Sequence, residues 1–359
     1  MKAAVCYEAG KPLVIEEIDI DTPRPGEVKV KMAATAVCHS DIHAIRGEIP
    51  QPLPSVPGHE SAGYIEEVGE GVTSVKPGDT VVASLLAACG KCRFCMGGRP
   101  HMCNAVWPRS TESAFHNKKG QDLIQMFRIG SFGEYTILDE SQVVKIPADM
   151  PLDSAALLAC GVITGFGAVV NRAKVKVGSS CVIIGVGGVG LNSVQAAAIS
   201  GAYPVIAVDL SDSKLESSKV FGATHIVNSG KVDAVEAVKE LTGGSGADYV
   251  FVTVGSAAAA RTGISMTGPC GMAVMVGLPD FKDTIELSPI EFIMSEKIMT
   301  GSFMGTTSLK YDIPKMVDLY QAGILKLDEL ITARYPLEQI NEAIQAVLDG
   351  KALRNVITF

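Results

Sequence analysis

The sequence predicts an α/β protein with a β-rich domain and a doubly wound parallel sheet. Short alternating apolar and polar runs, separated by proline and glycine, dominate the chain up to about residue 84. A glycine-rich turn near residue 185 then joins an apolar strand to a small-residue helix, and strands alternate with helical patterns as far as residue 303. At 359 residues the chain also exceeds the roughly 250 to 300 residues that a single core usually serves, so we expect two domains.

The composition is typical of a globular protein that binds small molecules. Hydrophobic residues make up 47% and charged residues 19% of the chain, and the net charge is −8, so we expect no nucleic-acid partner. No apolar run precedes Glu8, which predicts a cytoplasmic protein without a secretory signal. Residues 177–208 carry no charge, but their six glycines favour a buried strand, helix and strand over a membrane span.

The β-rich region begins at the N-terminus. Residues 2–36 alternate apolar and polar side chains between breaks at prolines and at Gly26, which predicts half-buried antiparallel strands. Similar runs recur at residues 63–68 and 80–84. Chemistry commonly lies on the loops of such a scaffold, and here the loops carry metal-binding side chains.

Two potential zinc ligands, Cys38 and His59, lie on these loops. Thiolate and imidazole groups suit zinc, and a catalytic zinc site has three protein ligands and one open position. A single cysteine or histidine is more often an ordinary core residue, but here hydroxyl and imidazole groups stand beside Cys38 in the sequence. The third ligand must come from elsewhere, and Cys160, in the small-residue segment 155–170, is the best remaining candidate.

A second cluster consists of Cys89, Cys92, Cys95 and Cys103. Four thiolates this close in sequence can surround one tetrahedral ion and leave no position for substrate, which predicts a structural zinc site. The repeated spacing disfavours four unrelated buried cysteines, and the acidic balance disfavours a zinc ribbon that binds nucleic acid. Nine cysteines in a cytoplasmic chain indicate metal binding rather than disulfides.

The glycine-rich turn has the full context of a dinucleotide-binding site: a strand before it, a helix after it and an acid, Asp209, at the end of the next strand. The glycines let the backbone approach a pyrophosphate at the helix N-terminus. Asp209 would accept the ribose hydroxyls and repel a 2′-phosphate, so NAD is favoured over NADP; Lys214 is the nearest base and could also contact the ribose. The residues of the turn are Gly185, Gly187, Gly188, Val189 and Gly190.

Further strands are expected at residues 225–227, 248–254, 272–276 and 298–303. With the two strands around the glycine-rich turn they make six, alternating with helices, which specifies a doubly wound parallel sheet. After residue 304 the sequence predicts amphipathic segments at 314–322 and 337–348 and a strand around Val356, which would return to the first domain and complete it.

Over essentially its whole length the chain resembles the zinc-containing medium-chain alcohol dehydrogenases, and most of all their class III-like branch. The resemblance implies a chaperonin-10-like (GroES-like) catalytic domain at residues 1–160 and 304–359 and an NAD-binding Rossmann domain at residues 161–303. It also implies two zinc ions per chain, one catalytic and one structural. The matching motifs are Cys38 to His43, Gly58-His59-Glu60, the four-cysteine cluster, Cys160-Gly161-x-x-Thr164-Gly165, the Gly185 turn with Asp209, and Gly350-Lys351-x-x-Arg354.

The resemblance implies reversible hydride transfer between a primary alcohol, aliphatic, allylic or aromatic, and NAD. Zinc would act as a Lewis acid on the alcohol, while Ser40 and His43 would relay the proton through a cofactor ribose. Asp41 would fix the tautomer of His59, and Glu60 would approach the zinc from behind and aid ligand exchange. The implied cofactor contacts are His39 and Arg354 to the pyrophosphate, Thr164 to the nicotinamide, and the backbone of Val276, Gly277 and Leu278 to its carboxamide.

Substrate identity follows less directly. Residues 104–135 are expected to be irregular, and the candidates for an apolar substrate pocket are Leu85, Trp107 and Ile129, while Arg109 leaves room for an anionic substrate. The acids that recognise glutathione in the class III-like branch fall near Ile49 and Gln51, so a free alcohol is favoured. The alternatives are an S-(hydroxymethyl)thiol or formaldehyde dehydrogenase and a non-catalytic nucleotide-binding protein.

The assembly is also predicted from the resemblance. The segment between Cys103 and Cys160 is long enough to keep the loop that dimeric family members have. This implies a homodimer paired through the edges of the cofactor-domain sheets, with a tetramer as the other possibility.

Overall fold

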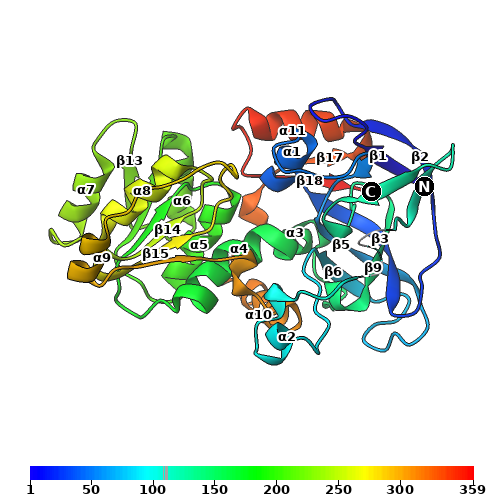
Figure 1. The fold of residues 1–359 in the computed structure, drawn as a ribbon, viewed down its shortest axis with the longest axis horizontal. Helices are drawn as coiled ribbons and strands as arrows, with labels where there is room; N and C mark the ends of the chain where they lie inside the picture. Colours follow the sequence, from blue (N-terminus) through cyan, green and yellow to red (C-terminus); the bar gives the residue numbers. More distant parts are fainter. Residues whose placement is uncertain (108, 110–111) are drawn as a thin grey trace. The chain divides into compact units, whose positions relative to one another are not determined.

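The computed structural model describes residues 1–107, 109 and 112–359. The chain forms two compact units, Met1–Gly161 with Ser308–Phe359, and Val162–Thr307. In Figure 1 the blue N-terminal and red C-terminal segments belong to the same unit. The chain therefore leaves its first unit once and returns to it.

Two sheets build the first unit. The smaller has the strand order β1-β2-β7-β8-β4, and the larger has the order β10-β6-β5-β3-β18-β17, with β9 also paired to β3. Because β18 pairs with β3, with Val356 opposite Ala36, the end of the chain completes a sheet of the N-terminal region, as the sequence predicted. The strands are β1 (Lys2–Val5), β2 (Val14–Ile20), β3 (Glu27–Ala36), β4 (Ser55–Val56), β5 (Glu60–Val68), β6 (Thr80–Ser84), β7 (Phe115–Asn117), β8 (Asp122–Gln125), β9 (Tyr135–Asp139), β10 (Val143–Lys145), β17 (Ile331–Pro336) and β18 (Arg354–Thr358).

The segment 104–135 is more regular than predicted, because it contains the hairpin of β7 and β8. Phe115 and Leu123 face each other in this hairpin and are fully buried. Strands of three and four residues offer too few alternating positions for a sequence pattern to reveal them.

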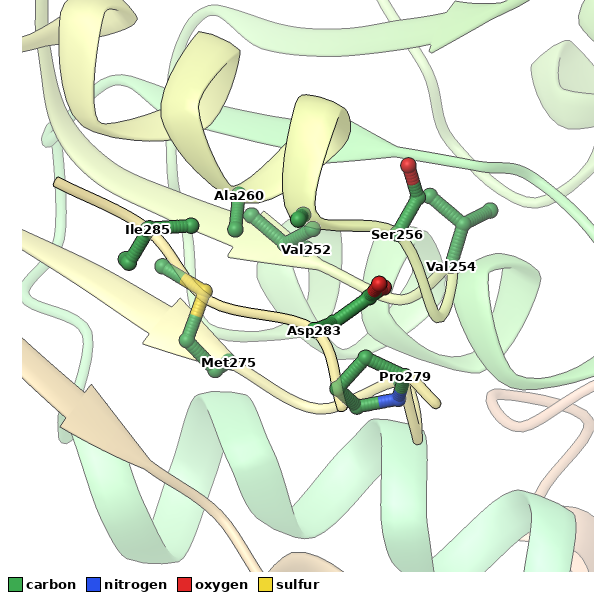
Figure 2. Close-up of a pocket in the computed structure, with 10 residues that line it drawn as sticks. Val252, Val254, Ser256, Ala260, Met275, Pro279, Asp283 and Ile285 are labelled. Atoms are coloured by element: carbon green, nitrogen blue, oxygen red, sulfur yellow. The ribbon is translucent and has the colours of Figure 1, made fainter. Parts of the chain in front are cut away.

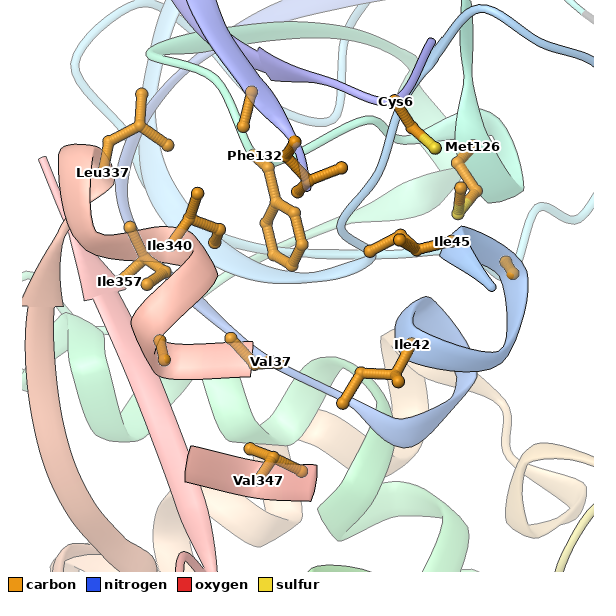
Figure 3. Packing of buried hydrophobic residues seen from close by; sticks show 14 residues of the cluster. Cys6, Val37, Ile42, Ile45, Met126, Phe132, Leu337, Ile340, Val347 and Ile357 are labelled. Carbon is orange, nitrogen blue, oxygen red and sulfur yellow. The ribbon is translucent and has the colours of Figure 1, made fainter. Parts of the chain in front are cut away.

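A hydrophobic cluster in the first unit joins the two ends of the chain. Figure 3 shows Ile42 and Ile45 on helix α1 together with Phe132 and with Ile340 and Ile357 from the C-terminal segment. Each of these side chains is at least 95% buried, which stabilises the fold by roughly 1.5 to 3 kcal/mol per side chain. The cluster thereby fixes α1, which begins directly after Cys38. The helices of this unit are α1 (His39–Ile45), α2 (Arg93–Met96), α3 (Leu152–Leu157), α10 (Leu309–Gln321) and α11 (Ile340–Leu348).

The second unit is a six-stranded sheet in the order β13-β12-β11-β14-β15-β16, with every neighbouring pair parallel. This confirms the predicted doubly wound sheet. Its strands are β11 (Cys181–Ile184), β12 (Val205–Asp209), β13 (His225–Asn228), β14 (Ala247–Val252), β15 (Thr267–Met275) and β16 (Ile298–Gly301). Its helices are α4 (Ile163–Gly167), α5 (Gly188–Ile199), α6 (Asp212–Val220), α7 (Ala234–Leu241), α8 (Ala257–Met266) and α9 (Pro289–Ser295).

Two apolar stretches resemble membrane spans in composition alone. Residues 177–208 form β11, α5 and β12, the strand, helix and strand that their glycines predicted. The helical stretch Leu152–Ala173 is long and apolar enough to cross a bilayer, but 89% of its apolar window is buried within the protein. It therefore has the character of a core helix.

Candidate metal and dinucleotide sites

Cys38, His59 and Cys160 bring their ligand atoms together in the first unit. Cys38 is the N-cap of α1, His59 directly precedes β5, and Cys160 lies in a π-helical turn, Leu158–Val162. All three are buried, their ligand atoms lie within 4.8 Å of one another, and His59 Nε2 is 3.3 Å from Cys160 Sγ. Bonds of about 2.3 Å to sulfur and about 2.0 Å to nitrogen place tetrahedral ligands about 3.5 Å apart, so the set fits zinc.

Asp41 orients the histidine of this set. Its Oδ1 lies 2.7 Å from His59 Nδ1, and both side chains are fully buried. The Asp41 carboxylate also accepts hydrogen bonds from the backbone N–H groups of Cys38, at 3.2 Å, and Gly58, at 3.1 Å. A proton held on Nδ1 leaves Nε2 as the metal-binding nitrogen, which is the role that the sequence suggested for Asp41.

The charges around the set favour a cation. The Cys160 thiol lowers the pKa of Cys38 well below its usual value, burial opposes this shift, and His59 adds to it. Burial disfavours protonation of His59, but Asp41 and the Cys38 thiolate outweigh it and raise the pKa of His59 to about 10. A divalent ion would replace this proton, so metal binding at the site competes with protons.

Glu60, expected to approach the zinc from behind, is not among the three residues whose ligand atoms converge. Its Oε1 accepts a hydrogen bond of 2.6 Å from the backbone N–H of Gly161, and its other oxygen forms an ion pair with Arg354. A Cβ at Gly161 would lie 3.0 Å from Glu60 Oε1, so a glycine permits this close approach. Glu60 therefore links the residue after Cys160 to β18, and Arg354, predicted to contact the pyrophosphate, is buried against it.

The predicted relay residues lie on one helix. Ser40 Oγ is 3.8 Å from Cys38 Sγ, and the His39 and His43 ring centroids are 6.5 Å apart. His43 Nδ1 pairs with the Glu48 carboxylate, and the His43 side chain is 40% exposed. Glu48 was not predicted from the sequence, although an acid five residues beyond a histidine near a helix end was a detectable signal.

Cys89, Cys92, Cys95 and Cys103 also converge, with their sulfurs within 4.8 Å of one another. The Cys92 and Cys103 sulfurs are 3.9 Å apart, close to the roughly 3.8 Å between two sulfurs of a zinc tetrahedron. The backbone N–H of Cys95 points at the Cys92 sulfur and, despite partial desolvation, holds the pKa of Cys92 at about 6. This cluster has four sulfur ligands, so the ion that it fits has no open position.

The glycine-rich turn joins β11 to α5 in the second unit, with Gly187 as the helix N-cap. A Cβ at Gly190 would lie 1.8 Å from the carbonyl oxygen of Gly185, so the turn requires glycine there. Asp209, at the end of β12, accepts a 2.9 Å hydrogen bond from the N–H of Val186 through Oδ2. A hydrogen bond thus holds the acid beside the glycine-rich turn, which is the arrangement of a dinucleotide-binding site. Lys214 follows Asp209 by five residues, on α6.

A pocket of about 150 Å³ opens at the carboxyl ends of β14 and β15, where ligands bind in doubly wound sheets. Figure 2 shows its mostly apolar lining, with Asp283 among Val252, Val254, Met275, Pro279 and Ile285. Gly277 also lines it, but the N–H groups of Val276 and Gly277 both donate to the Val252 carbonyl. Val276 and Gly277 were predicted to contact the nicotinamide carboxamide through their backbone. Because their N–H groups are already bonded, they would contact it through their carbonyl oxygens. Thr164 Oγ1 lies 3.7 Å from the sulfur of Met304.

Two predicted substrate contacts are wrong. Ile129 is fully buried in a core cluster with Val28 and Leu138, so it cannot line a pocket. The Arg109 side chain is 8% exposed and pairs with Glu27 and Asp21, so its charge is already neutralised.

For Leu85 and Trp107, the other two candidates for the substrate pocket, the assignment stays a prediction. Leu85 is half-buried, and its carbonyl oxygen accepts a hydrogen bond from Arg128. Trp107 is half-buried, and its indole N–H has no partner in the described part of the chain.

Comparison with known proteins agrees with this geometry. The family model described as "Alcohol dehydrogenase GroES-like domain" matches residues 24–148, and that described as "Zinc-binding dehydrogenase" matches residues 188–322. The chain is 42% identical to a putative alcohol dehydrogenase D of Mycobacterium tuberculosis and to an NDMA-dependent alcohol dehydrogenase of Amycolatopsis methanolica, covering 99% of this chain and 98% of each relative. It is 38% identical to the S-(hydroxymethyl)glutathione dehydrogenase of Saccharomyces cerevisiae, covering 99% of this chain and 95% of that relative.

The crystal structure of benzyl alcohol dehydrogenase from Acinetobacter calcoaceticus has the same fold. It matches with a TM-score of 0.93 and 35% identity, over 100% of this chain and 99% of that one. Two family models, full-length relatives and a buried two-sulfur, one-nitrogen ligand set therefore lead to one conclusion: the chain belongs to the zinc-containing medium-chain alcohol dehydrogenase family and is an oxidoreductase.

Proposed function

We propose that this enzyme transfers a hydride between a primary alcohol and NAD, giving the aldehyde reversibly. The observation that carries the proposal is the buried set of Cys38, His59 and Cys160, whose histidine is oriented by Asp41. Three ligands leave one position of a zinc tetrahedron for a substrate oxygen, as in catalytic rather than structural sites. The four-cysteine cluster would hold a second, structural zinc ion.

In the proposed reaction, zinc would supply Lewis-acid chemistry that lowers the pKa of the alcohol toward neutrality. Cys38, His59 and Cys160 would hold the ion, and Asp41 keeps the proton of His59 on Nδ1. Ser40 Oγ, beside Cys38, would take up the alcohol proton. His43 would receive it at its imidazole, which contacts the Glu48 carboxylate and which solvent can reach.

NAD would accept the hydride at the second unit. Its pyrophosphate would lie on the N-terminus of α5, next to the turn that begins at Gly185. Asp209 supports NAD over NADP, because a carboxylate at the end of β12 repels a 2′-phosphate.

A thiol-adduct aldehyde dehydrogenase is the second candidate. The 38% identity with a relative named S-(hydroxymethyl)glutathione dehydrogenase favours it. Ile49 and Gln51 argue against it, because neither offers a carboxylate for an amino group of glutathione. The nearest acid, Glu48, already pairs with His43 and Arg46.

One panel of assays separates these functions. Purified zinc-loaded enzyme is given aliphatic, allylic and aromatic primary alcohols with NAD, with NADP and with added NDMA, and formaldehyde with and without glutathione. We expect reduction of NAD with free alcohols. A requirement for glutathione would favour the second candidate, and no turnover in any arm would refute both.

We also propose a homodimer in the cytoplasm. Among the described residues, the edge strand β16 pairs with a strand on one side only, and its Ile298 and Met299 are 48% and 39% exposed. Pairing of two β16 strands would cover these side chains. Light scattering at several protein concentrations should give twice the mass of the 37.6 kDa chain, and a mass of one chain would exclude the dimer.

A further inference from the structure

Two side chains from the larger sheet hold the backbone on either side of Cys160. The carbonyl oxygen of Ala159 accepts a hydrogen bond of 2.6 Å from Ser84 Oγ. The N–H of Gly161 donates a hydrogen bond of 2.6 Å to Glu60 Oε1. A residue has only two soft backbone dihedrals, and each joins its Cα to one of the two neighbouring peptide groups. The two bonds together therefore fix the direction in which the Cys160 side chain leaves the backbone.

Ser84 and Glu60 are direct neighbours across two strands. Ser84 ends β6, Glu60 begins β5, and the two residues are paired in the antiparallel register of these strands. Side chains opposite each other in such a pair lie on one face of the sheet, with Cβ atoms about 4.5 to 5.5 Å apart. Both side chains are fully buried. Because His59 directly precedes Glu60, the strand pair that carries one metal ligand also holds the backbone around another.

The turn that contains Cys160 depends on such bonds more than an ordinary helical turn does. Leu158–Val162 is π-helical and lies between α3 and α4. Turns of this kind are rare, occur mostly as single turns within α-helices and are frequent at functional sites. Their hydrogen-bond pattern differs from that of the α-helical turns on either side. Bonds from outside the helix can therefore set the position of Cys160.

The hydroxyl of Ser84 is itself preorganised. The carbonyl oxygen of Ser84 accepts a hydrogen bond of 3.1 Å from Nε2 of Gln142, a side chain that is 4% exposed. The pairing with Glu60 holds the same backbone within the sheet. On a fixed backbone the one heavy-atom torsion of a serine has only three staggered positions for Oγ. The position observed here is the one that reaches the Ala159 carbonyl.

We propose that Ser84 is a positioning residue for the catalytic metal site. By bonding the Ala159 carbonyl, it holds the sulfur of Cys160 where the other two ligand atoms converge. This inference rests on the proposed function, because it concerns the set of Cys38, His59 and Cys160 that would hold the catalytic zinc ion. Ser84 acts through the backbone of Cys160, and a preorganised ligand set binds its metal more tightly.

The test measures the zinc affinity of the full-length Ser84→Ala variant, with zinc content followed across a series of chelator concentrations. We expect the affinity of the catalytic site to fall about 10- to 100-fold, the range for a partner that orients a metal ligand. The four-cysteine cluster should keep its zinc ion. Unchanged affinity at the catalytic site in a folded Ser84→Ala variant would overturn the proposal.

Ser84→Thr and Ser84→Val separate the hydroxyl from the shape of the side chain. Threonine and valine have nearly the same volume, and both suit a strand, but only threonine can bond the Ala159 carbonyl. We expect the threonine variant to bind catalytic zinc about 10-fold or more tightly than the valine variant. This pair also provides the test if Ser84→Ala fails to fold, and equal zinc affinity in the two variants would refute the role of the hydroxyl.

Ser218→Ala is the matched control. Ser218 is also fully buried, and its Oγ donates a hydrogen bond of the same length, 2.6 Å, to the carbonyl oxygen of Leu215 in the second unit. Its replacement should leave the zinc affinity of both sites unchanged. If Ser218→Ala lowers the affinity of the catalytic site as much as Ser84→Ala does, the loss is a general effect of removing a buried hydroxyl, and the proposal fails.

Alcohol oxidation distinguishes this inference from the proposed function. Zinc-loaded Ser84→Ala should oxidise primary alcohols with a lower kcat/KM than wild type, while its affinity for NAD stays the same. If Ser84→Ala loses zinc affinity as expected but the wild-type enzyme oxidises no alcohol, the assignment of Ser84 stands and the proposed function fails. If the wild-type enzyme is active and Ser84→Ala binds catalytic zinc as tightly as it does, the function stands and the assignment of Ser84 is refuted.

Discussion

The imidazole of His59 is held 2.7 Å from the carboxylate of Asp41, and neither side chain reaches solvent. This contact directs Nε2 of His59 toward Cys160 Sγ, 3.3 Å away. The two cysteines and the histidine come from a helix cap, the start of a strand and a π-helical turn. The carboxylate is therefore what converts three separate side chains into a preorganised ligand set.

Replacing Asp41 with asparagine should weaken the catalytic metal site. The asparagine side chain would keep the shape of the aspartate but lose the charge that supports His59, and loss of such a partner usually lowers metal affinity about 10- to 100-fold. After competition with a chelator, zinc analysis of the Asp41→Asn variant should show that zinc is retained at the four-cysteine cluster only. Asp248→Asn, which changes an aspartate that bonds Ser180 in the second unit, is the control and should keep both ions. Equal retention in the Asp41 and Asp248 variants would show that Asp41 has no role in metal binding.

Replacing Asp209 with alanine should weaken discrimination between the two nicotinamide cofactors. The change removes the carboxylate expected to repel a 2′-phosphate and also the acceptor for the Val186 N–H. We expect the KM for NAD to rise about 10-fold or more and the preference for NAD over NADP to fall by a similar factor. Steady-state kinetics with both cofactors measure this. The control is Asp212→Ala, which changes an exposed aspartate of α6. If Asp209→Ala leaves the cofactor preference unaltered, the ribose contact lies elsewhere.

Much of this architecture could be predicted from the sequence because its signals are local. The turn at Gly185 and the acid at Asp209 follow one strand–helix–strand pattern, and α5 and β12 formed as that pattern predicted. Cys38 and His59 were recognisable from their ligand chemistry. Cys160 lies 101 residues beyond His59, so no local spacing joins the two, and only the need for a third ligand and the family resemblance pointed to it.

The errors concern properties that a local pattern does not contain. From the sequence alone, Ile129 could line a pocket or belong to the core. Only the packing of the folded protein shows that it is fully buried. Arg109 meets Glu27 and Asp21 across 82 and 88 residues, so its neutralisation was invisible in the sequence. The loop that places Phe127 against His59 has a left-handed backbone at non-glycine residues, which propensity would never assign.

Replacing Arg109 with methionine should destabilise the first unit. Glu27, with a side chain 7% exposed, would be left as a buried carboxylate without its partner, and breaking such a pair typically costs about 3 to 5 kcal/mol. Chemical denaturation should show this loss. Arg24→Gln is the control, because its pair with Glu112 is exposed and contributes about 1 kcal/mol at most. Equal stability of the two variants would show that the Arg109 pairs are not stabilising.

Stability near Asp21 should depend on pH. Burial raises the pKa of Asp21, but bonds from Arg109 and His116 outweigh it, so the folded-state pKa is lowered. The stabilisation is therefore fully present above the unfolded pKa of about 3.9 and is lost as pH falls through the lower, folded value. The difference in unfolding free energy between wild type and Asp21→Asn should be constant from pH 6 to about pH 5 and shrink below about pH 4. A difference that grows on acidification would contradict this assignment.

The most direct test of the whole account is X-ray diffraction from zinc-loaded crystals at wavelengths on either side of the zinc absorption edge. We predict two anomalous peaks per chain, one bounded by Cys38, His59 and Cys160 and one by the four cysteines, with Cys160→Ser losing the first and Cys95→Ser the second. As a control, Cys270→Ser, an exposed cysteine outside both clusters, should keep both peaks. A crystal with no peak among Cys38, His59 and Cys160 would contradict the claim that these residues form a catalytic zinc site.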